Sequence, residues 1–218
     1  GSASANQLEG GNGSDLLRGL GGADVLMGGA GTDTADYTGS TAGVTVLLGT
    51  GGIATGVGGD AQGDQLDSIE ALTGSSFGDR LGGNAGNNVL RGAGGADTLS
   101  GGAASDIFLY GAASDSFATS AATFDQILDF TSGTDQIVVS PIDAIPGTPQ
   151  DDAFVWRGAT TTFSGGGVGS GHYFLATVGG VGGALVEFDV NGNGVLEGSD
   201  MRIFLAGVTS LLSTDFIL

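Results

Sequence analysis

The chain lacks cysteine and lysine, and among its 218 residues it has 3 prolines and 1 histidine. Without cysteine, a disulfide scaffold is excluded. The single histidine is His172, so the sequence has no HExxH pair and no second histidine for a zinc site or a catalytic triad. We expect His172 to be a structural or surface residue. No apolar run reaches eighteen residues, so no membrane-spanning helix is predicted. No charged segment followed by an apolar stretch opens the sequence, which excludes a classical signal peptide.

Positive charge is also scarce, with 5 arginines against 24 acidic residues and a net charge of −19. Such a surface repels phosphate, so nucleic acid is not an expected partner. Glycine is abundant, with 46 residues, which excludes an ordinary helical or doubly wound domain. Disorder is the serious competitor, but a hydrophobic share of 40% is too high for a solvated tail. No catalytic constellation is found, and we expect that this chain alone is not an enzyme.

A nine-residue period organises the first half of the chain. Residues 10–36 hold three consecutive units, and residues 74–109 hold four more. Each unit has a glycine-rich turn, Asp or Asn at position six and an apolar residue at position eight. Two units form one coil, and position eight points inward. The residues predicted to stack in the core are Leu8, Leu17, Leu26, Leu81, Leu90, Leu99 and Phe108.

The chemistry of the unit predicts bound calcium. Glycine permits the positive φ angles of a tight turn, and the turn's carbonyls together with the carboxylate are hard oxygen ligands. Turns on one side of the coil carry their acids eighteen residues apart, in the pairs Asp15 with Asp33, Asp79 with Asp97, Asn6 with Asp24, and Asn88 with Asp106. The predicted ligands of several Ca²⁺ ions are Gly11, Gly13, Asp15, Gly22, Asp24, Gly29, Gly31, Asp33, Asp79, Asn88, Gly95, Asp97, Gly102 and Asp106.

These units resemble the glycine-rich calcium repeats of repeats-in-toxin (RTX) proteins. The stretches 32–75 and 106–135 are similar to the C-terminal region of serralysin-type metalloproteases, and the second also resembles the calcium-binding modules of alginate epimerases. The resemblance implies an all-β fold: a parallel β-roll over residues 1–109, irregular at 37–73, capped by a C-terminal antiparallel β region over 110–218. Leu20, Asn84, Ala93 and Ala104 depart from the glycine pattern, and Asn at position six predicts weaker sites.

The middle stretch is acidic, and we expect one or more of its acids, Asp60 and Asp64 foremost, to bind calcium. Solvated surface acids are an equally open interpretation. After residue 109 the sequence predicts strands at 126–130, 136–139, 153–156, 173–178, 184–190 and 203–206. The glycines at 165–183 have no repeat register, and we expect them to form a loop.

Residues 189–200 fit the calcium-loop pattern D-x-[DN]-x-[DN]-G. The predicted ligands are Asp189, Asn191, Asn193, the carbonyl of Val195, and Asp200. The flanks have strand character, so an EF-hand is not expected, and a metal-free Asn-Gly hairpin is the alternative.

The chain closes with Asp215, Phe216, Ile217 and Leu218, which resemble the C-terminal signal read by a type I secretion exporter. The alternative is a final β-strand. Taken with the resemblance, this predicts a secreted bacterial module that folds on calcium and belongs to a larger enzyme, with an upstream catalytic domain. The competing hypothesis is a calcium-dependent anchoring module of a surface-layer protein or adhesin.

Overall fold

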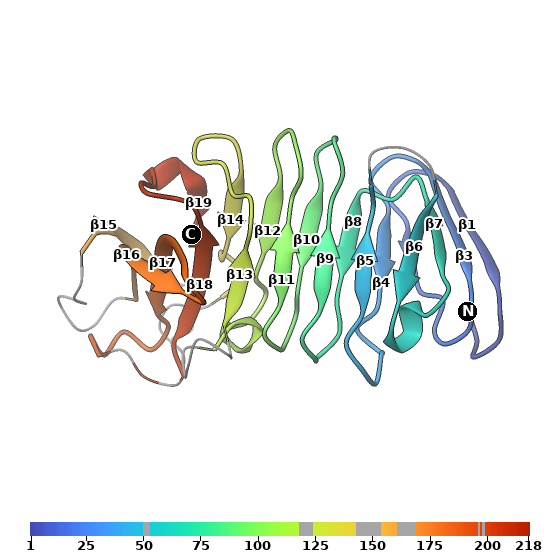
Figure 1. The fold of residues 1–218 in the computed structure, drawn as a ribbon, viewed down its shortest axis with the longest axis horizontal. Coiled ribbons are helices and arrows are strands. Elements are labelled where there is room, and N and C mark those ends of the chain that lie inside the picture. The colour runs from blue at the N-terminus through green and yellow to red at the C-terminus, as the bar shows by residue number, and fades with distance from the viewer. Residues whose placement is uncertain (50–52, 118–123, 143–153, 161–168, 196, 198) are drawn as a thin grey trace.

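Short strands stack along one long axis, with the N-terminus at one end and the C-terminus near the other (Figure 1). The structure is a computed structural model, and it describes residues 1–49, 53–117, 124–142, 154–160, 169–195, 197 and 199–218. The described residues form no helix with the length and apolar character needed to cross a bilayer.

Nearly all regular structure is β. The strands of the first half are β1 (Gln7–Asn12), β2 (Leu16–Leu17), β3 (Val25–Ala30), β4 (Thr34–Asp36), β5 (Thr45–Leu47), β6 (Ala54–Val57), β7 (Gln65–Asp67), β8 (Ala71–Thr73), β9 (Arg80–Gly82), β10 (Val89–Arg91), β11 (Thr98–Ser100) and β12 (Ile107–Leu109). Those of the second half are β13 (Asp125–Ile127), β14 (Gln136–Val138), β15 (Val155–Ala159), β16 (Ser170–Val178), β17 (Val181–Asp189), β18 (Met201–Ala206) and β19 (Phe216–Ile217). Single 3₁₀ turns are η1 (Gly59–Ala61), η2 (Ala113–Asp115) and η3 (Ser213–Asp215).

Two sheets face each other along the roll. Among the described residues, one sheet has the order β1-β3-β7-β6-β5-β9-β11-β13-β18-β17-β16-β15 and the other β19-β14-β12-β10-β8-β4-β2. In the regular coils each residue pairs in parallel with the residue eighteen positions later, as Leu8 with Leu26 and Leu81 with Leu99. The nine-residue period therefore places consecutive units alternately in the two sheets, and the predicted parallel β-roll is confirmed.

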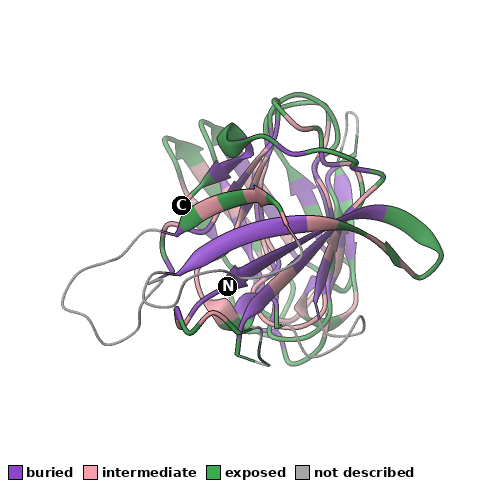
Figure 2. Cartoon of the chain, turned by 90° about the vertical axis from the view of Figure 1, so that its left-hand side faces the viewer, coloured by how far each residue is buried: buried purple, intermediate pink, exposed green. Residues whose placement is uncertain are grey.

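The core lies between the sheets, where the inward side chains are buried (Figure 2). Six of the seven predicted stacking residues are buried, and Leu8, in the first strand, is half-buried against the same cluster. Position eight is inward because its neighbours along a three-residue strand must face outward. The apolar position of the repeat therefore becomes a continuous column.

The chain leaves the regular coil between β4 and β8. β5 pairs in parallel with β9, while β6 runs antiparallel between β5 and β7. One sheet thus gains two strands that have no counterpart in the other, where β4 pairs directly with β8. This irregular stretch remains within the stack, because β7 also pairs with β3 at Leu26–Leu66.

The sheets extend past residue 109, where the sequence analysis placed the end of the roll. β13 pairs in parallel with β11 and with β18, and β14 pairs in parallel with β12 and with β19. Longer excursions between these strands hide the period in the sequence. The antiparallel strands β16, β17 and β18 then cover the C-terminal end, as the expected cap.

The loop expected at 165–183 is wrong for the part that the structure describes. Gly182 and Gly183 lie in β17, and Gly179 and Gly180, with φ of +58° and +87°, turn the hairpin from β16. Glycine is needed here because both turn residues are left-handed, as in two-residue hairpin loops. Residues 165–168 lie outside the described residues.

An aromatic cluster joins this cap to the last coil. The ring centroid of Trp156 lies 3.9 Å from that of Phe216 and 6.1 Å from that of Tyr173. His172 is buried, and its Nε2 lies 3.2 Å from Oε2 of Glu187, whose Oε1 accepts from Arg202 Nε at 2.6 Å. Its position fits a structural role.

Candidate metal sites in the turns

The turns place glycine where the backbone is left-handed. The seven glycines predicted as ligands all have φ between +100° and +140°: Gly11, Gly13, Gly22, Gly29, Gly31, Gly95 and Gly102. They occupy positions two and four of their units. Leu20, Ala93 and Ala104 replace glycine at such positions and keep φ of +64°, +65° and +70°. The turn geometry is therefore retained at these departures, at some strain.

A carboxylate ladder runs along each edge of the roll. From the second coil on, one oxygen of a position-six acid accepts the N–H of the position-six residue one coil earlier. The N–H of Asp15 donates to Asp33 Oδ1 at 2.9 Å, and that of Asp79 donates to Asp97 Oδ1 at 2.8 Å. Asn6 with Asp24 and Asn88 with Asp106 are joined in the same way, at 2.7 and 2.8 Å. The structure thus brings each predicted pair onto adjacent coils.

The other carboxylate oxygen has no donor at six positions of the described chain. These buried oxygens are Oδ2 of Asp15, Asp24, Asp33, Asp97, Asp106 and Asp125. In the regular units, each faces the first glycine of its own turn. A Cβ on Gly10 would lie 2.7 Å from Asp15 Oδ2, and one on Gly92 would lie 2.7 Å from Asp97 Cγ. The first glycine is therefore required for the carboxylate to fit.

These carboxyl groups are electrostatically unsatisfied. Burial raises the pKa of Asp97 to about 8, with the charges of Asp79 and Asp115 adding to it and the N–H of Asp79 opposing it. Burial likewise raises the pKa of Asp106 to about 6, with Asp135 contributing. A buried anion that lacks a counterion disfavours its charged form. The sites of Asp97 and Asp106 therefore favour either a proton or a cation.

The turn backbone supplies further oxygens. Adjacent turns stack so closely that a Cβ on Gly31 would lie 2.7 Å from the carbonyl carbon of Gly13, and one on Gly102 would lie 3.0 Å from that of Asn84. In the described part of the chain no three acidic or histidine side chains converge on one point. A cation here would therefore be held by a carboxylate and backbone carbonyls together. That donor set consists of hard oxygens and fits Ca²⁺.

Some predicted ligands have hydrogen-bond partners within the chain instead. Asp64 accepts from the N–H of Asp24 at 2.8 Å and from the hydroxyl of Tyr37 at 3.1 Å. Asp79 accepts from Val44 N–H at 2.7 Å and, with its other oxygen, from Ser75 N–H at 2.6 Å.

Two further predicted ligands also lack a free buried carboxylate oxygen. The Oδ1 of Asn88 accepts from the N–H of Asn84 at 2.7 Å, and its amide donates to the carbonyl of Glu70 at 3.0 Å. Asp60 lies in η1, half-exposed, and its N–H donates to Ser40 Oγ at 3.0 Å.

Three further acids join the ladders: Glu70, in the acidic middle stretch, and Asp125 and Asp135, which the sequence analysis did not select. Glu70 accepts from the N–H of Asp33 at 3.0 Å, and Asp125 from that of Asp97 at 2.9 Å. Asp135 accepts from the N–H of Asp106 at 3.0 Å, while Asp215, outside the ladder, accepts from the N–H of Gly133 at 2.7 Å. The signal was present for two of them: both Asp125 and Asp135 open the triplet Asp-Gln-Ile, which has the spacing of positions six to eight.

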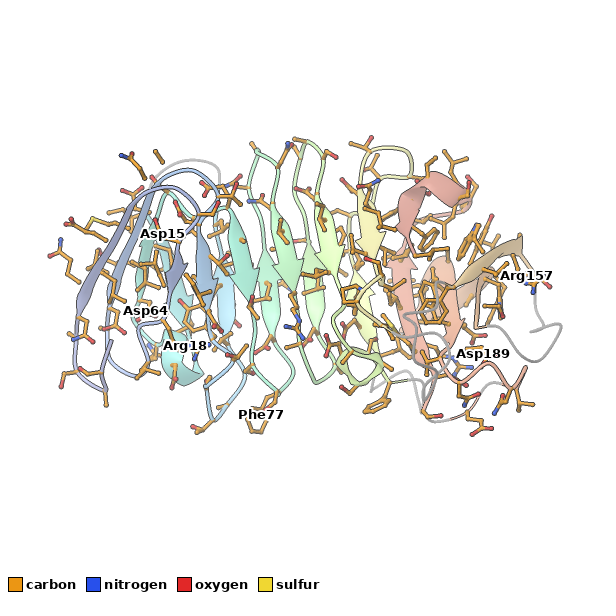
Figure 3. The ribbon with its side chains drawn as sticks, turned by 180° about the vertical axis from the view of Figure 1, so that it is seen from behind. Asp15, Arg18, Asp64, Phe77, Arg157 and Asp189 are labelled. Carbon is orange, nitrogen blue, oxygen red and sulfur yellow. The ribbon has the colours of Figure 1, made fainter. Side chains whose placement is uncertain are left out.

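The loop between β17 and β18 brings its predicted ligands to one turn, and Figure 3 labels Asp189 at its start. Oδ2 of Asp189 accepts from Gly194 N–H at 2.8 Å, while its buried Oδ1 has no donor. Asn193 Oδ1 accepts from Val195 N–H at 2.7 Å. Asp200 accepts from Val190 N–H at 3.1 Å, and burial together with the charge of Asp189 raises its pKa.

Comparison with protein-family models agrees with the repeat period. The family model described as the RTX calcium-binding nonapeptide repeat matches residues 1–35 and 73–116 in 4 copies. No curated protein sequence matches the chain. A solution structure of the AlgE6R3 subunit from the Azotobacter vinelandii mannuronan C5-epimerase is similar over 100% of this chain and 80% of that one, with 20% identity and a TM-score of 0.36.

Proposed function

We propose that this chain is a module that folds when it binds calcium after secretion, and the match of residues 1–35 and 73–116 to the RTX calcium-binding nonapeptide repeat supports this. In this proposal it is the C-terminal part of a larger secreted bacterial enzyme. A type I exporter would recognise its C-terminal residues. The chain itself supplies no catalysis, and its role is to fold, stabilise and export the polypeptide to which it belongs.

The observation that carries the proposal is the row of buried carboxylate oxygens that have no donor. An ionised carboxylate buried without a partner destabilises a fold by several kcal/mol. Calcium, when bound, supplies the missing positive charge. At five of the six carboxylates, all but Asp15, the chain's own contribution is to hold the second oxygen by an N–H from the adjacent coil, so that the free oxygen stays in place.

The energies are of the right size for a switch. A site with a Kd of about 10⁻⁴ M at about 1 mM calcium stabilises the fold by about 1.4 kcal/mol. About six such sites contribute about 8 kcal/mol, which is comparable with the net stability of a whole domain. The folded state would therefore prevail outside the cell and fail in the low calcium of the cytoplasm.

The position of the C-terminal residues supports export before folding. Phe216 and Ile217 form β19, the last strand of its sheet, and Phe216 is buried against Trp156. Asp215 accepts from Ser132 Oγ at 2.7 Å and from Leu212 N–H at 2.8 Å. Asp215 and Phe216 are buried in the folded roll, so an exporter could read these two side chains only while the roll is unfolded. The signal and the final strand are thus two states of the same residues.

The loop 189–200 is proposed as a further calcium site. Its argument is the buried, donorless Oδ1 of Asp189 together with the oxygens of Asn191 and Asn193 in the same turn. A metal-free hairpin would leave that carboxylate oxygen unsatisfied.

Circular dichroism of the chain tests the central proposal. Chain stripped of metal with excess chelator should lack β-sheet signal, and calcium in the millimolar range should restore it cooperatively. A full β-sheet signal in stripped protein would refute calcium-dependent folding. Fusing the last 60 residues to a reporter and measuring secretion by a type I exporter, with and without Asp215–Leu218, tests the export signal.

The alternative function is an anchoring module of a surface-layer protein or adhesin. Among the described residues, β1 and β15 stand at the two ends of their sheet, and strand edges of this kind can add further strands. Calcium-dependent formation of extended sheets by the isolated chain, seen by electron microscopy, would support this alternative over a monomeric stabilising module.

A further inference from the structure

The position-six acids of the roll fall into two kinds. Six have a buried Oδ2 without a donor, and we call these open turns. In others, a donor from the chain itself occupies the second oxygen, and we call these closed turns. Asp79 and Asp64 are closed turns to which a hydroxyl donates, and Oδ2 of Asp79 also accepts the N–H of Ser75 at 2.6 Å.

Ser75 occupies the centre of the turn that leads to Asp79. Its Oγ lies 2.9 Å from Oδ1 and 3.1 Å from Oδ2 of Asp79, and 3.3 Å from the carbonyl oxygen of Phe77. It also accepts the N–H of Phe77 at 3.1 Å. The hydroxyl thus lies among the carboxylate and carbonyl oxygens that a cation would need. Neither Ser75 nor Phe77 adopts the positive φ that positions two and four adopt in open turns.

Tyr37 closes the turn at Asp64 in a different way. It stands at position one, where regular units have glycine, and its side chain is buried. Its hydroxyl donates to Oδ2 of Asp64 at 3.1 Å, while Oδ1 accepts from the N–H of Asp24. Both oxygens of this carboxylate, labelled in Figure 3 within the N-terminal third, are therefore hydrogen-bonded inside the chain.

We propose that the hydroxyls of Ser75 and Tyr37 take the place of calcium in their turns, and so determine which turns of the roll bind the ion. This inference rests on the proposed calcium-binding function. Its consequence is spatial. Within the turns of the roll, calcium is confined to two groups, one containing Asp15, Asp24 and Asp33 and the other containing Asp97, Asp106 and Asp125. A metal-free section that includes Asp64 and Asp79 separates them, and this section is held by the chain's own donors.

Loss of ions from single variants provides the first test. Native mass spectrometry of the full chain in calcium counts the bound ions in wild type, Asp33→Asn and Asp79→Asn. Asparagine keeps the Oδ1 acceptor of the ladder but removes the charge. We expect Asp33→Asn to lose at least one ion and Asp79→Asn to lose none. Loss of an ion from Asp79→Asn as well would overturn the inference and leave the proposed function standing, whereas no loss from Asp33→Asn would overturn the function itself.

Gain of an ion provides the second test, which holds even if Asp79→Asn fails to fold. The double variant Ser75→Gly with Phe77→Gly restores glycine at positions two and four, and Phe77 is exposed at the outer rim of its turn (Figure 3). We expect this variant to bind one more calcium ion than wild type. Ser76→Gly, at position three of the same unit, is the matched control and should leave the number unchanged. A folded double variant that binds no additional ion would refute the assignment of Ser75.

Discussion

Gly92→Ala is expected to disable one calcium turn by displacing a single carboxylate. A Cβ on Gly92 would lie 2.7 Å from Cγ and 2.9 Å from Cβ of Asp97. Real Cβ atoms do not approach so closely, so the Asp97 side chain must move away. It would then release the N–H of Asp79, which it now accepts at 2.8 Å.

The size of the effect follows from two losses. A buried N–H left without its acceptor costs about 1–3 kcal/mol, and one lost ion costs about 1.4 kcal/mol at 1 mM calcium. We therefore expect Gly92→Ala to destabilise the folded module by about 2–4 kcal/mol. If folding takes up about six ions, this raises the calcium midpoint of folding about twofold to threefold.

Gly94→Ala in the same turn is the control. Its nearest neighbour would be Ser76 Cα at 3.8 Å, and its φ lies outside the left-handed region. Alanine should be neutral or stabilise by about 0.4–1 kcal/mol here. Calcium titrations followed by circular dichroism compare the two variants with wild type. If Gly92→Ala and Gly94→Ala fold at the same calcium concentration, the packing argument for the first glycine fails.

Three further predictions address charge and packing. In chelator, the β-sheet signal should increase as the pH falls from about 8 to 5. The folded-state pKa values of Asp97, about 8, and of Asp106, about 6, exceed the ordinary 3.8, so the folded state binds protons that the unfolded chain releases. A signal that decreases over this range would contradict this prediction. Asn88→Asp should gain one calcium ion in native mass spectrometry, because it exchanges an amide that donates to a backbone carbonyl for a charged oxygen; an unchanged ion count would show that this turn stays closed. Phe216→Ala should cost about 3–5 kcal/mol in urea unfolding and shift the fluorescence of Trp156 to the red, because the two rings are in contact; unchanged stability would place β19 outside the cooperative unit.

The regular coils could be predicted because the repeat encodes them in every unit. In each unit, glycine at positions two and four forms the turn, the acid at position six joins the ladder, and the apolar residue at position eight enters the core. Gly29, Gly31 and Asp33 show the first two of these roles in one unit. The register of eighteen follows directly from the period. Local pattern and tertiary position agree in these coils, so the sequence is sufficient.

The excursions were not predictable in the same way. Asp125 follows its ladder partner Asp97 by 28 residues rather than 18, so periodicity alone does not connect them. The closed state of Asp79 depends on Ser75, whose N–H and hydroxyl both donate to the carboxylate. In the repeat pattern, Ser75 counts only as a departure from glycine at position two. The strand β17 contains glycines that composition assigns to a loop, and only its pairing on both sides with β16 and β18 makes it regular.

Position one of the unit explains where the chain can leave the coil. In a regular unit the carboxylate of the same turn fills the space beside position one, so only glycine fits. At Tyr37 and Tyr110 a buried ring stands at position one instead. Position six is then Ala42 after Tyr37 and Asp115 after Tyr110, and Asp115 accepts from Arg91 and from the N–H of Gly111 rather than joining the ladder. The ladder carboxylate that follows each excursion, Asp64 or Asp125, lies beside this tyrosine. Asp64 accepts a hydrogen bond from the hydroxyl of Tyr37. Burial, and then the charge of Asp125, raises the pKa of Tyr110. A tyrosine that replaces the first glycine of a unit is therefore a sequence signal for an inserted excursion followed by a return to the same edge of the roll.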